Sequence, residues 1–285
     1  MSSVTLRISE IKQPRGGYIK LSDFETITFD DGAILNEEEN VNASIIGSAV
    51  DYLTRYMTGA NIEDAFYIPL IGADRAEQFG IKKITKVAEK LMNDIYGLDD
   101  ESIINACKLT SFDLWYRNPF AATAASSYKE INPDPATIQN IQILVERCMG
   151  FFDEYGPVVA DGFTFEPPVE DLKAQAKMFR KGVGTYGGYT PTVDSGDGDF
   201  LTADTMWDIK VLRNKPQSKH TLQLLMYWIM GQHSGQEIYK NITGIGFFNP
   251  RLYTMYLLDM NNVPDEVLEA VERDVICYPE NEIWW

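Results

Sequence analysis

The sequence predicts an α/β fold in which helices flank a mixed central sheet and part of the chain forms a helical insertion. Three observations predict it. Residues 198–211 have the alternating pattern of a β-hairpin, and residues 222–230 are apolar nearly all round, as in a helix buried against a sheet. Between residues 43 and 155, apolar residues recur with a helical period, so the middle of the chain is expected to be mainly helical.

The chain has 285 residues, and its hydrophobic content of 45% is enough to bury a full core. The sequence contains no Pro/Ser-rich linker and no internal repeat, which predicts a single domain over residues 1–285. We expect N-terminal strands and the first core helix over 1–60, a mainly helical insertion over 61–185, and the core sheet with its helices over 186–285.

The N-terminal half is expected to begin with short β-like pieces and turns over residues 1–40. Helical patterns follow at residues 43–58, 75–96, 101–116 and 134–155. The motif Asn132-Pro-Asp-Pro135 is a start signal for the last of them.

The C-terminal half should carry the sheet. Residues 182–187 match a dinucleotide-binding glycine pattern but lack the strand before it and the helix after it, so a mobile loop is expected there. Beyond the hairpin and the buried helix, two antiparallel strands are predicted over 242–248 and 252–260, and a final helix over 264–273.

The three cysteines are widely separated, which argues against a disulfide framework and against a zinc site. With only two histidines, a His-rich metal centre is excluded as well. No apolar run is long enough to span a bilayer, and the start of the chain lacks a signal sequence. The sequence therefore predicts a cytoplasmic protein without a membrane partner.

The hairpin brings charged side chains together. If its turn falls at residues 203–204, Asp199 stands opposite Asp208, and Lys210 shares a face with Asp208. Two opposed carboxylates destabilise a sheet unless a cation compensates, and Mg²⁺ bound through oxygen ligands is the natural one. Taken singly, each aspartate would more often occupy a turn or a solvated face.

The helix after the hairpin carries two polar residues in an apolar setting. Gln223 and Tyr227 lie four residues apart and so share one face. Buried amides and hydroxyls need hydrogen-bond partners. The carboxylates and lysine of the hairpin could provide them, or the two residues are ordinary satisfied core polars.

The pattern of Gly-x-Asp199, then Asp208-Ile209-Lys210, then Gln223-x-x-x-Tyr227 resembles the RecB-type, lambda-exonuclease-like branch of the PD-(D/E)XK nuclease superfamily. The similarity covers residues 190–260 and implies a restriction-endonuclease-like core.

The resemblance implies a role for each motif residue. Asp199 and Asp208 would bind Mg²⁺ or Mn²⁺, Ile209 would add its backbone carbonyl, and Lys210 would orient or activate the attacking water. Phosphodiester hydrolysis needs charge neutralised on the phosphate and a nucleophilic water near neutral pH, and a divalent ion supplies both.

The remaining motif residues have supporting roles in such nucleases. Gln223 and Tyr227 would position the active site and the nucleic-acid strand. An upstream Gly-x-x-x-His helix is matched here by Gly47-Ser-Ala-Val-Asp51, with Asp in the His position. Asp51 is therefore a metal-ligand candidate, although a polar residue on such a helix is often only part of a solvated face.

The net charge of −17 argues against a nucleic-acid enzyme, because phosphate binding depends on Lys and Arg. Its distribution weakens this objection, since residues 171–220 hold eight basic and six acidic side chains. Arg213, Lys215 and Lys219 follow the predicted catalytic strand and are the expected contacts to a phosphate backbone.

These expectations add up to a Mg²⁺- or Mn²⁺-dependent deoxyribonuclease acting in DNA processing, repair or defence, with DNA as its partner. Two alternatives remain open. One is an acidic protein that keeps a nuclease-like fold and mimics DNA or inhibits a DNA-binding protein. The other is a non-catalytic subunit of a nuclease complex, and the sequence also leaves a homo-oligomer or a protein partner open.

Overall fold

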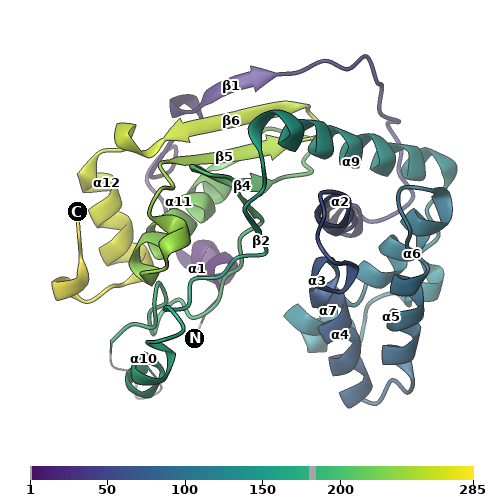
Figure 1. Ribbon diagram of the computed structural model, residues 1–285, viewed down its shortest axis with the longest axis horizontal. Helices are drawn as coiled ribbons and strands as arrows, with labels where there is room; N and C mark the ends of the chain where they lie inside the picture. Colours follow the sequence, from purple (N-terminus) through teal and green to yellow (C-terminus); the bar gives the residue numbers. More distant parts are fainter. Residues whose placement is uncertain (1, 180–183) are drawn as a thin grey trace. The chain divides into compact units, whose positions relative to one another are not determined.

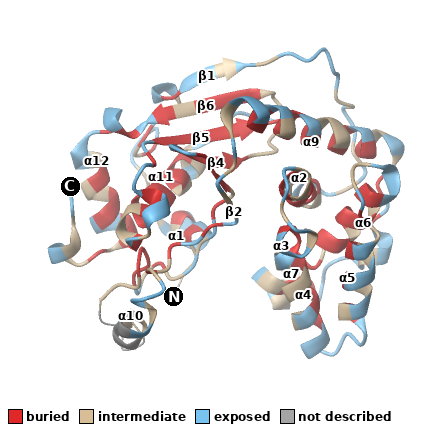
Figure 2. Ribbon diagram, viewed as in Figure 1, coloured by how far each residue is buried: buried red, intermediate tan, exposed pale blue. Residues whose placement is uncertain are grey.

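The computed structural model describes residues 2–179 and 184–285, and the chain within them divides into two compact units. The sheet unit comprises Met1–Phe29 and Tyr155–Trp285, and the helical unit comprises Asp30–Glu154. Part of the predicted glycine-rich loop over 182–187 lies outside the described residues. Each unit has its own buried residues, whose ribbon is coloured red in Figure 2.

Within the described residues, the sheet has six strands in the order β1-β6-β5-β4-β3-β2, and Figure 1 labels all of them except β3. Its strands are β1 (Glu25–Thr28), β2 (Ala160–Asp161), β3 (Phe200–Leu201), β4 (Thr205–Ile209), β5 (Gly244–Asn249) and β6 (Thr254–Asp259). The β4–β5 pair is parallel and every other pair is antiparallel. The prediction of an α/β protein with a mixed sheet is confirmed. The antiparallel β5–β6 hairpin was also predicted correctly.

The helices of the sheet unit are α1 (Val4–Glu10), α10 (Leu172–Phe179), α11 (Ser218–Ser234) and α12 (Asp265–Ala270), the last continued by a π-helical turn over Val271–Ile276. Short 3₁₀ turns lie at Leu21–Asp23, Glu237–Tyr239, Met260–Asn262 and Glu280–Glu282. The prediction of β-like pieces at the N-terminus is wrong for α1. Ser3 caps this helix by accepting a hydrogen bond from Leu6 N at 3.2 Å, and Val4 and Ile8 bury one of its faces.

The helical unit contains α2 (Ala43–Met57), α3 (Ile62–Ala65), α4 (Tyr67–Gln78), α5 (Ile84–Asn93), α6 (Asp100–Thr110), α7 (Asp113–Arg117), α8 (Pro119–Ala122), a 3₁₀ turn (Tyr128–Glu130) and most of α9 (Pro135–Tyr155). The predictions of helices over 43–58 and 134–155 are confirmed. The single helices expected over 75–96 and 101–116 are each divided in two. The first division follows from left-handed backbone at Gly80 (φ +99°) and Lys83 (φ +65°), which an α-helix cannot contain.

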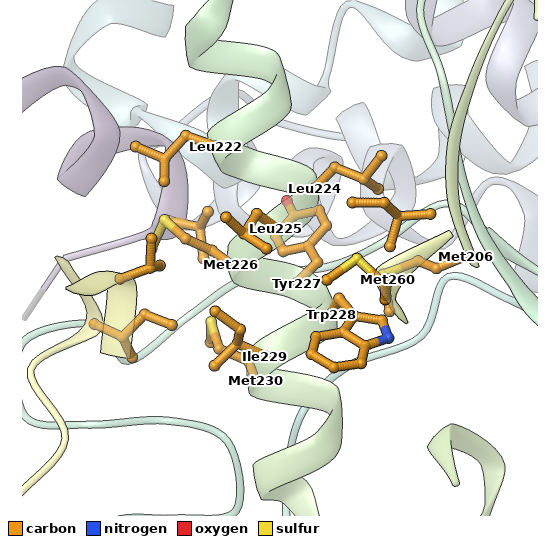
Figure 3. Close-up of a cluster of buried hydrophobic side chains, with 14 of the residues drawn as sticks. Met206, Leu222, Leu224, Leu225, Met226, Tyr227, Trp228, Ile229, Met230 and Met260 are labelled. Carbon is orange, nitrogen blue, oxygen red and sulfur yellow. The ribbon is translucent and has the colours of Figure 1, made fainter. Parts of the chain in front are cut away.

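Helix α11 is the centre of the sheet unit's core and packs against α1 and β5. Figure 3 shows side chains gathered around this helix, labelled Met206, Leu222, Leu224, Leu225, Met226, Tyr227, Trp228, Ile229, Met230 and Met260. Burial of apolar surface on nearly every side of the helix stabilises it in this position. The predicted burial of this helix is therefore confirmed.

The C-terminal residues dock on the sheet unit. The Trp285 ring lies 5.4 Å from Trp228, and the Trp284 ring stacks on His233 at 3.9 Å. In the part of the chain that the structure describes, no helix combines the length and the apolarity needed to cross a membrane.

Candidate active site

The β3–β4 hairpin places two aspartates next to each other. Phe200 pairs with Trp207, and Thr202 N donates to Thr205 O at 2.9 Å, which closes the turn at residues 203–204 as predicted. Asp199 immediately precedes β3, and because the pair is antiparallel it lies beside the end of β4. Its Oδ2 accepts a hydrogen bond from the backbone N–H of Ile209 at 2.9 Å.

Asp208 and Lys210 form a close ion pair at the end of β4. Asp208 is only 3% exposed, and Lys210 Nζ lies 2.8 Å from its Oδ2 and 3.0 Å from its Oδ1. Lys210 N donates to Phe248 O at 2.9 Å, so pairing with β5 continues one residue beyond β4. Lys210 therefore projects from the same face as Asp208. A carboxylate this deeply buried needs such a partner, because desolvating a lone charge is costly.

The acidic loop before β3 is held by hydrogen bonds from other segments. Gly198 N donates to Phe163 O at 2.9 Å, Tyr189 OH donates to Gly196 O at 2.9 Å, and Val4 N donates to Ser195 O at 2.9 Å. A Cβ atom at Gly198 would lie 2.1 Å from the Phe163 ring, so only glycine fits directly before Asp199. The loop thus presents its carboxylates from a fixed backbone.

Helix α11 faces this loop with its two polar residues. Gln223 Nε2 donates to the Tyr227 hydroxyl at 2.8 Å, so the two side chains satisfy each other. Burial raises the pKa of Tyr227 well above its usual value, and the negative charges of Asp197, Asp208 and Asp199 raise it further. The hydroxyl therefore stays protonated and lies within electrostatic reach of all three carboxylates.

Asp197 and His220 belong to this constellation, and the motif-based reasoning missed both. Asp197 is exposed and has the strongest electrostatic effect of the three aspartates on Tyr227. His220 sits one turn before Gln223 on α11. Burial, and then the charges of Lys210 and Lys219, lower the pKa of His220 to about 4. Helical spacing was the available signal, since residues 220, 223 and 227 share one face.

The predicted basic contacts lie on the connection between β4 and α11. Arg213, Lys215 and Lys219 are exposed there. Asn249, fully buried at the end of β5, donates from Nδ2 to Leu212 O at 2.9 Å and so fixes the start of this connection. The contact of these three residues with DNA stays a prediction.

Asp51 lies in the helical unit, not in the unit that holds the hairpin. There its carboxylate is paired with Arg55, with an Nε–Oδ1 distance of 3.2 Å. This i, i+4 pair on α2 explains the residue locally. Its role as a metal ligand stays a prediction.

The hairpin carries the oxygen donors of the predicted divalent-cation site. Among the described residues, no group of three or more His, Cys, Asp or Glu side chains is arranged to hold a metal ion. The hairpin supplies two carboxylates, and the predicted third donor, the Ile209 carbonyl, belongs to the backbone. Mg²⁺ prefers oxygen ligands and usually keeps several waters, with only one or two carboxylates from the protein. A Mg²⁺ or Mn²⁺ site at this hairpin stays a prediction.

The chemistry available is that of an acid–base and electrostatic site. Asp208 and Lys210 lie at the carboxyl end of β4, which runs parallel to β5, and the phenol of Tyr227 is within electrostatic reach of Asp197, Asp199 and Asp208. The imidazole of His220 is close enough to Lys210 and Lys219 for their charges to lower its pKa. Ligands of open α/β sheets bind outside the carboxyl ends of strands. Comparisons of the chain with protein-family models, with curated proteins and with solved structures find no match.

Proposed function

We propose that this protein is a Mg²⁺- or Mn²⁺-dependent nuclease that hydrolyses phosphodiester bonds of DNA, in DNA processing, repair or defence. The observation that carries the proposal is the arrangement of Asp199 and Asp208 beside Lys210 on the β3–β4 hairpin, with Gln223 and Tyr227 opposite on α11. These are the residues through which the chain resembles RecB-type, lambda-exonuclease-like PD-(D/E)XK nucleases. The mixed sheet with α11 packed against β5 is compatible with their restriction-endonuclease-like core.

In this proposal, the side chains divide the work of hydrolysis. Asp199 and Asp208 would hold the divalent ion, which would supply neutralisation of charge on the phosphate and a water of lowered pKa. Lys210 donates from Nζ to the attacking water or to the oxygen on which charge develops. Tyr227, which stays protonated, donates a hydrogen bond where the carboxylates are concentrated.

The acidity of the chain is compatible with a nucleic-acid substrate if the contact is local. The net charge is −17, yet Arg213, Lys215 and Lys219 are exposed on the connection that leaves Lys210. Attraction to these three cations, together with repulsion from acidic surface elsewhere, would direct a phosphate backbone to the site. Because such attraction is screened, binding should weaken as salt concentration rises.

Cleavage assays test the proposal. Linear duplex, circular duplex and single-stranded DNA are incubated with the protein and Mg²⁺ or Mn²⁺, and the wild type is compared with Asp208→Ala and Lys210→Ala. We expect both substitutions to abolish cleavage, and we expect Asp208→Ala also to abolish Ca²⁺ binding measured by calorimetry. Asp204→Asn is the matched control, because Asp204 is an exposed aspartate at the turn of the same hairpin.

The net charge of −17 favours one alternative, an acidic binding protein with a nuclease-like fold that mimics DNA or inhibits a DNA-binding partner. Such a protein would cleave no substrate and would keep its partner affinity when Asp208 is replaced by Ala. A non-catalytic subunit would also be inert alone but would co-purify with a nuclease. A folded wild type that neither cleaves DNA nor binds a divalent ion would overturn the nuclease proposal.

A further inference from the structure

The polar face of α11 has three members. His220 precedes Gln223 by three residues and Tyr227 by seven, so all three project from one side of the helix. Most other residues of α11 from Leu222 to Met230 are buried and apolar. The helix therefore presents one polar stripe, and its members Gln223 and Tyr227 already face the carboxylates of the site.

The orientation of the His220 ring is set by the start of the helix. The backbone N–H of Gln217 donates to His220 Nδ1 at 2.9 Å. A ring nitrogen that accepts this bond carries no proton, so the proton of the neutral imidazole lies on Nε2. Nε2–H is on the opposite side of the ring from Gln217, and the side chain is half-buried.

The charges around the ring favour an anionic ligand. Lys210 and Lys219 are close enough to His220 to hold its pKa near 4, with burial as the larger cause. The ring is therefore uncharged at neutral pH and acts as a hydrogen-bond donor with two ammonium groups nearby. This environment disfavours a metal ion at Nε2, because the nitrogen is protonated and the neighbouring charges are positive.

We propose that His220 is a positioning residue that donates from Nε2–H to a non-bridging phosphate oxygen of the DNA strand beside Lys210. The inference rests on the proposed nuclease function and assigns to the site a substrate contact outside its motifs. A neutral donor adds directional hydrogen bonding to the attraction from Lys210 and Lys219. It leaves the charge balance of the metal-binding carboxylates unchanged.

The test compares His220→Phe, His220→Gln and the wild type on a labelled DNA duplex with Mg²⁺. Phe keeps a ring of similar shape without the donor, and Gln retains an amide N–H of similar reach. We expect kcat/KM to fall about 10- to 100-fold with Phe, as for loss of a hydrogen bond to a charged group, and Gln to recover most of it. Lys240→Ala, beyond the far end of α11, is the control for surface charge near this helix.

A second measurement separates contact from folding. Duplexes that carry one neutral methylphosphonate, placed at each phosphate in turn, are bound to the wild type in Ca²⁺. We expect one position to weaken binding of the wild type about 10-fold, and the same position to weaken binding of His220→Phe clearly less, because that variant has only the attraction to Lys210 and Lys219 left to lose. A structural role for His220 would not produce this pairing.

The outcomes distinguish the two proposals. If the wild type cleaves DNA but His220→Phe has the same kcat/KM, the inference on His220 is overturned and the nuclease stands. Methylphosphonate effects that are equal at every position in both proteins would overturn it too. If the wild type neither cleaves DNA nor binds a divalent ion, the proposed function fails and the inference fails with it.

Discussion

The two ends of α11 each carry one of the chain's two histidines, and these histidines have contrasting surroundings. His233, near the C-terminal end, is 3% exposed and paired with Glu272, whose side chain is 0% exposed. The rings of Tyr278 and Trp284 stack on it, each at 3.9 Å. His220, near the N-terminal end, is half-buried with one ring nitrogen bonded to the backbone.

The contrast separates a polar group that stabilises the fold from one that we propose binds a ligand. At the C-terminal end, Glu272 also accepts a hydrogen bond from Trp284 N at 3.1 Å, so the buried pair ties the chain terminus to the core. Fully satisfied buried networks of this kind make a structure rigid. At the N-terminal end, polar side chains face carboxylates and cations near solvent. The rigid end supports the helix whose other end carries the proposed site.

Glu272→Ala should have the largest effect on stability. It leaves His233 buried without its carboxylate, and breaking a buried pair by removing one partner costs about 3–5 kcal/mol. Urea unfolding measures the loss. Glu272→Gln is the control, because it keeps an acceptor for Trp284 N–H. A loss below about 1 kcal/mol, typical of exposed pairs, would contradict a structural role for this network.

Asp113 provides a second buried carboxylate for comparison, held by a phenol instead of an imidazole. Tyr52 OH donates to its Oδ2 at 2.7 Å. Burial raises the pKa of Asp113 from 3.8 to about 7, although the hydrogen bond from Tyr52 lowers it. The native state thus binds more protons than the unfolded chain between these values, and stability should fall as pH rises from 3.8 to about 7.

Asp113→Asn should remove this pH dependence and stabilise the protein at pH 8, by an amount on the order of a few kcal/mol. Thermal unfolding at pH 5 and pH 8 measures it in both proteins. Equal slopes in the two proteins would show that Asp113 does not titrate in this range.

Tyr227→Phe should have a smaller effect, mainly on activity. Losing the hydroxyl removes the acceptor of Gln223 and a donor near the carboxylates, so we expect cleavage to fall about 10-fold, or about 1.4 kcal/mol. Tyr239→Phe is the matched control, because its buried hydroxyl donates to Thr164 O at 2.5 Å. Both variants should lose about 1 kcal/mol of stability. Equal cleavage by the two would contradict a role for Tyr227 at the site.

Trp284→Ala should have the smallest effect. Its ring stacks on His233 but is 57% exposed, so we expect a loss of about 0.5–1.5 kcal/mol, the range of an aromatic pair. Urea unfolding followed by circular dichroism checks this value. A loss larger than that of Glu272→Ala would place the stabilisation in the stacked rings instead of the contact between His233 and Glu272.

Much of the sheet unit could be predicted from local pattern. The alternating pattern of residues 198–211 and a two-residue turn were sufficient to pair Phe200 with Trp207. A slip of one residue in the strand register would exchange the buried and solvent faces. The start of α9 followed from its proline signal. The division between α4 and α5 was missed, since it depends on Lys83 adopting a left-handed conformation that its residue type does not indicate.

The candidate site was predictable only where its residues form short-range motifs. Asp199, Asp208 and Lys210 lie on one hairpin, so their proximity follows from strand pairing. No short-range motif in the sequence indicated a role for Asn249. Its bond to Leu212 joins segments that are neighbours only because β5 lies parallel to β4.

The sequence alone was sufficient to predict the hairpin register and the shared face of Gln223 and Tyr227, because strand and helix periods are properties of the local backbone. The strand order β1-β6-β5-β4-β3-β2 needed the folded chain. The contrasting surroundings of His220 and His233, which occupy the same helix, also needed the folded chain. Their partners come from segments distant in sequence, and only tertiary packing selects among the many pairings that local pattern allows.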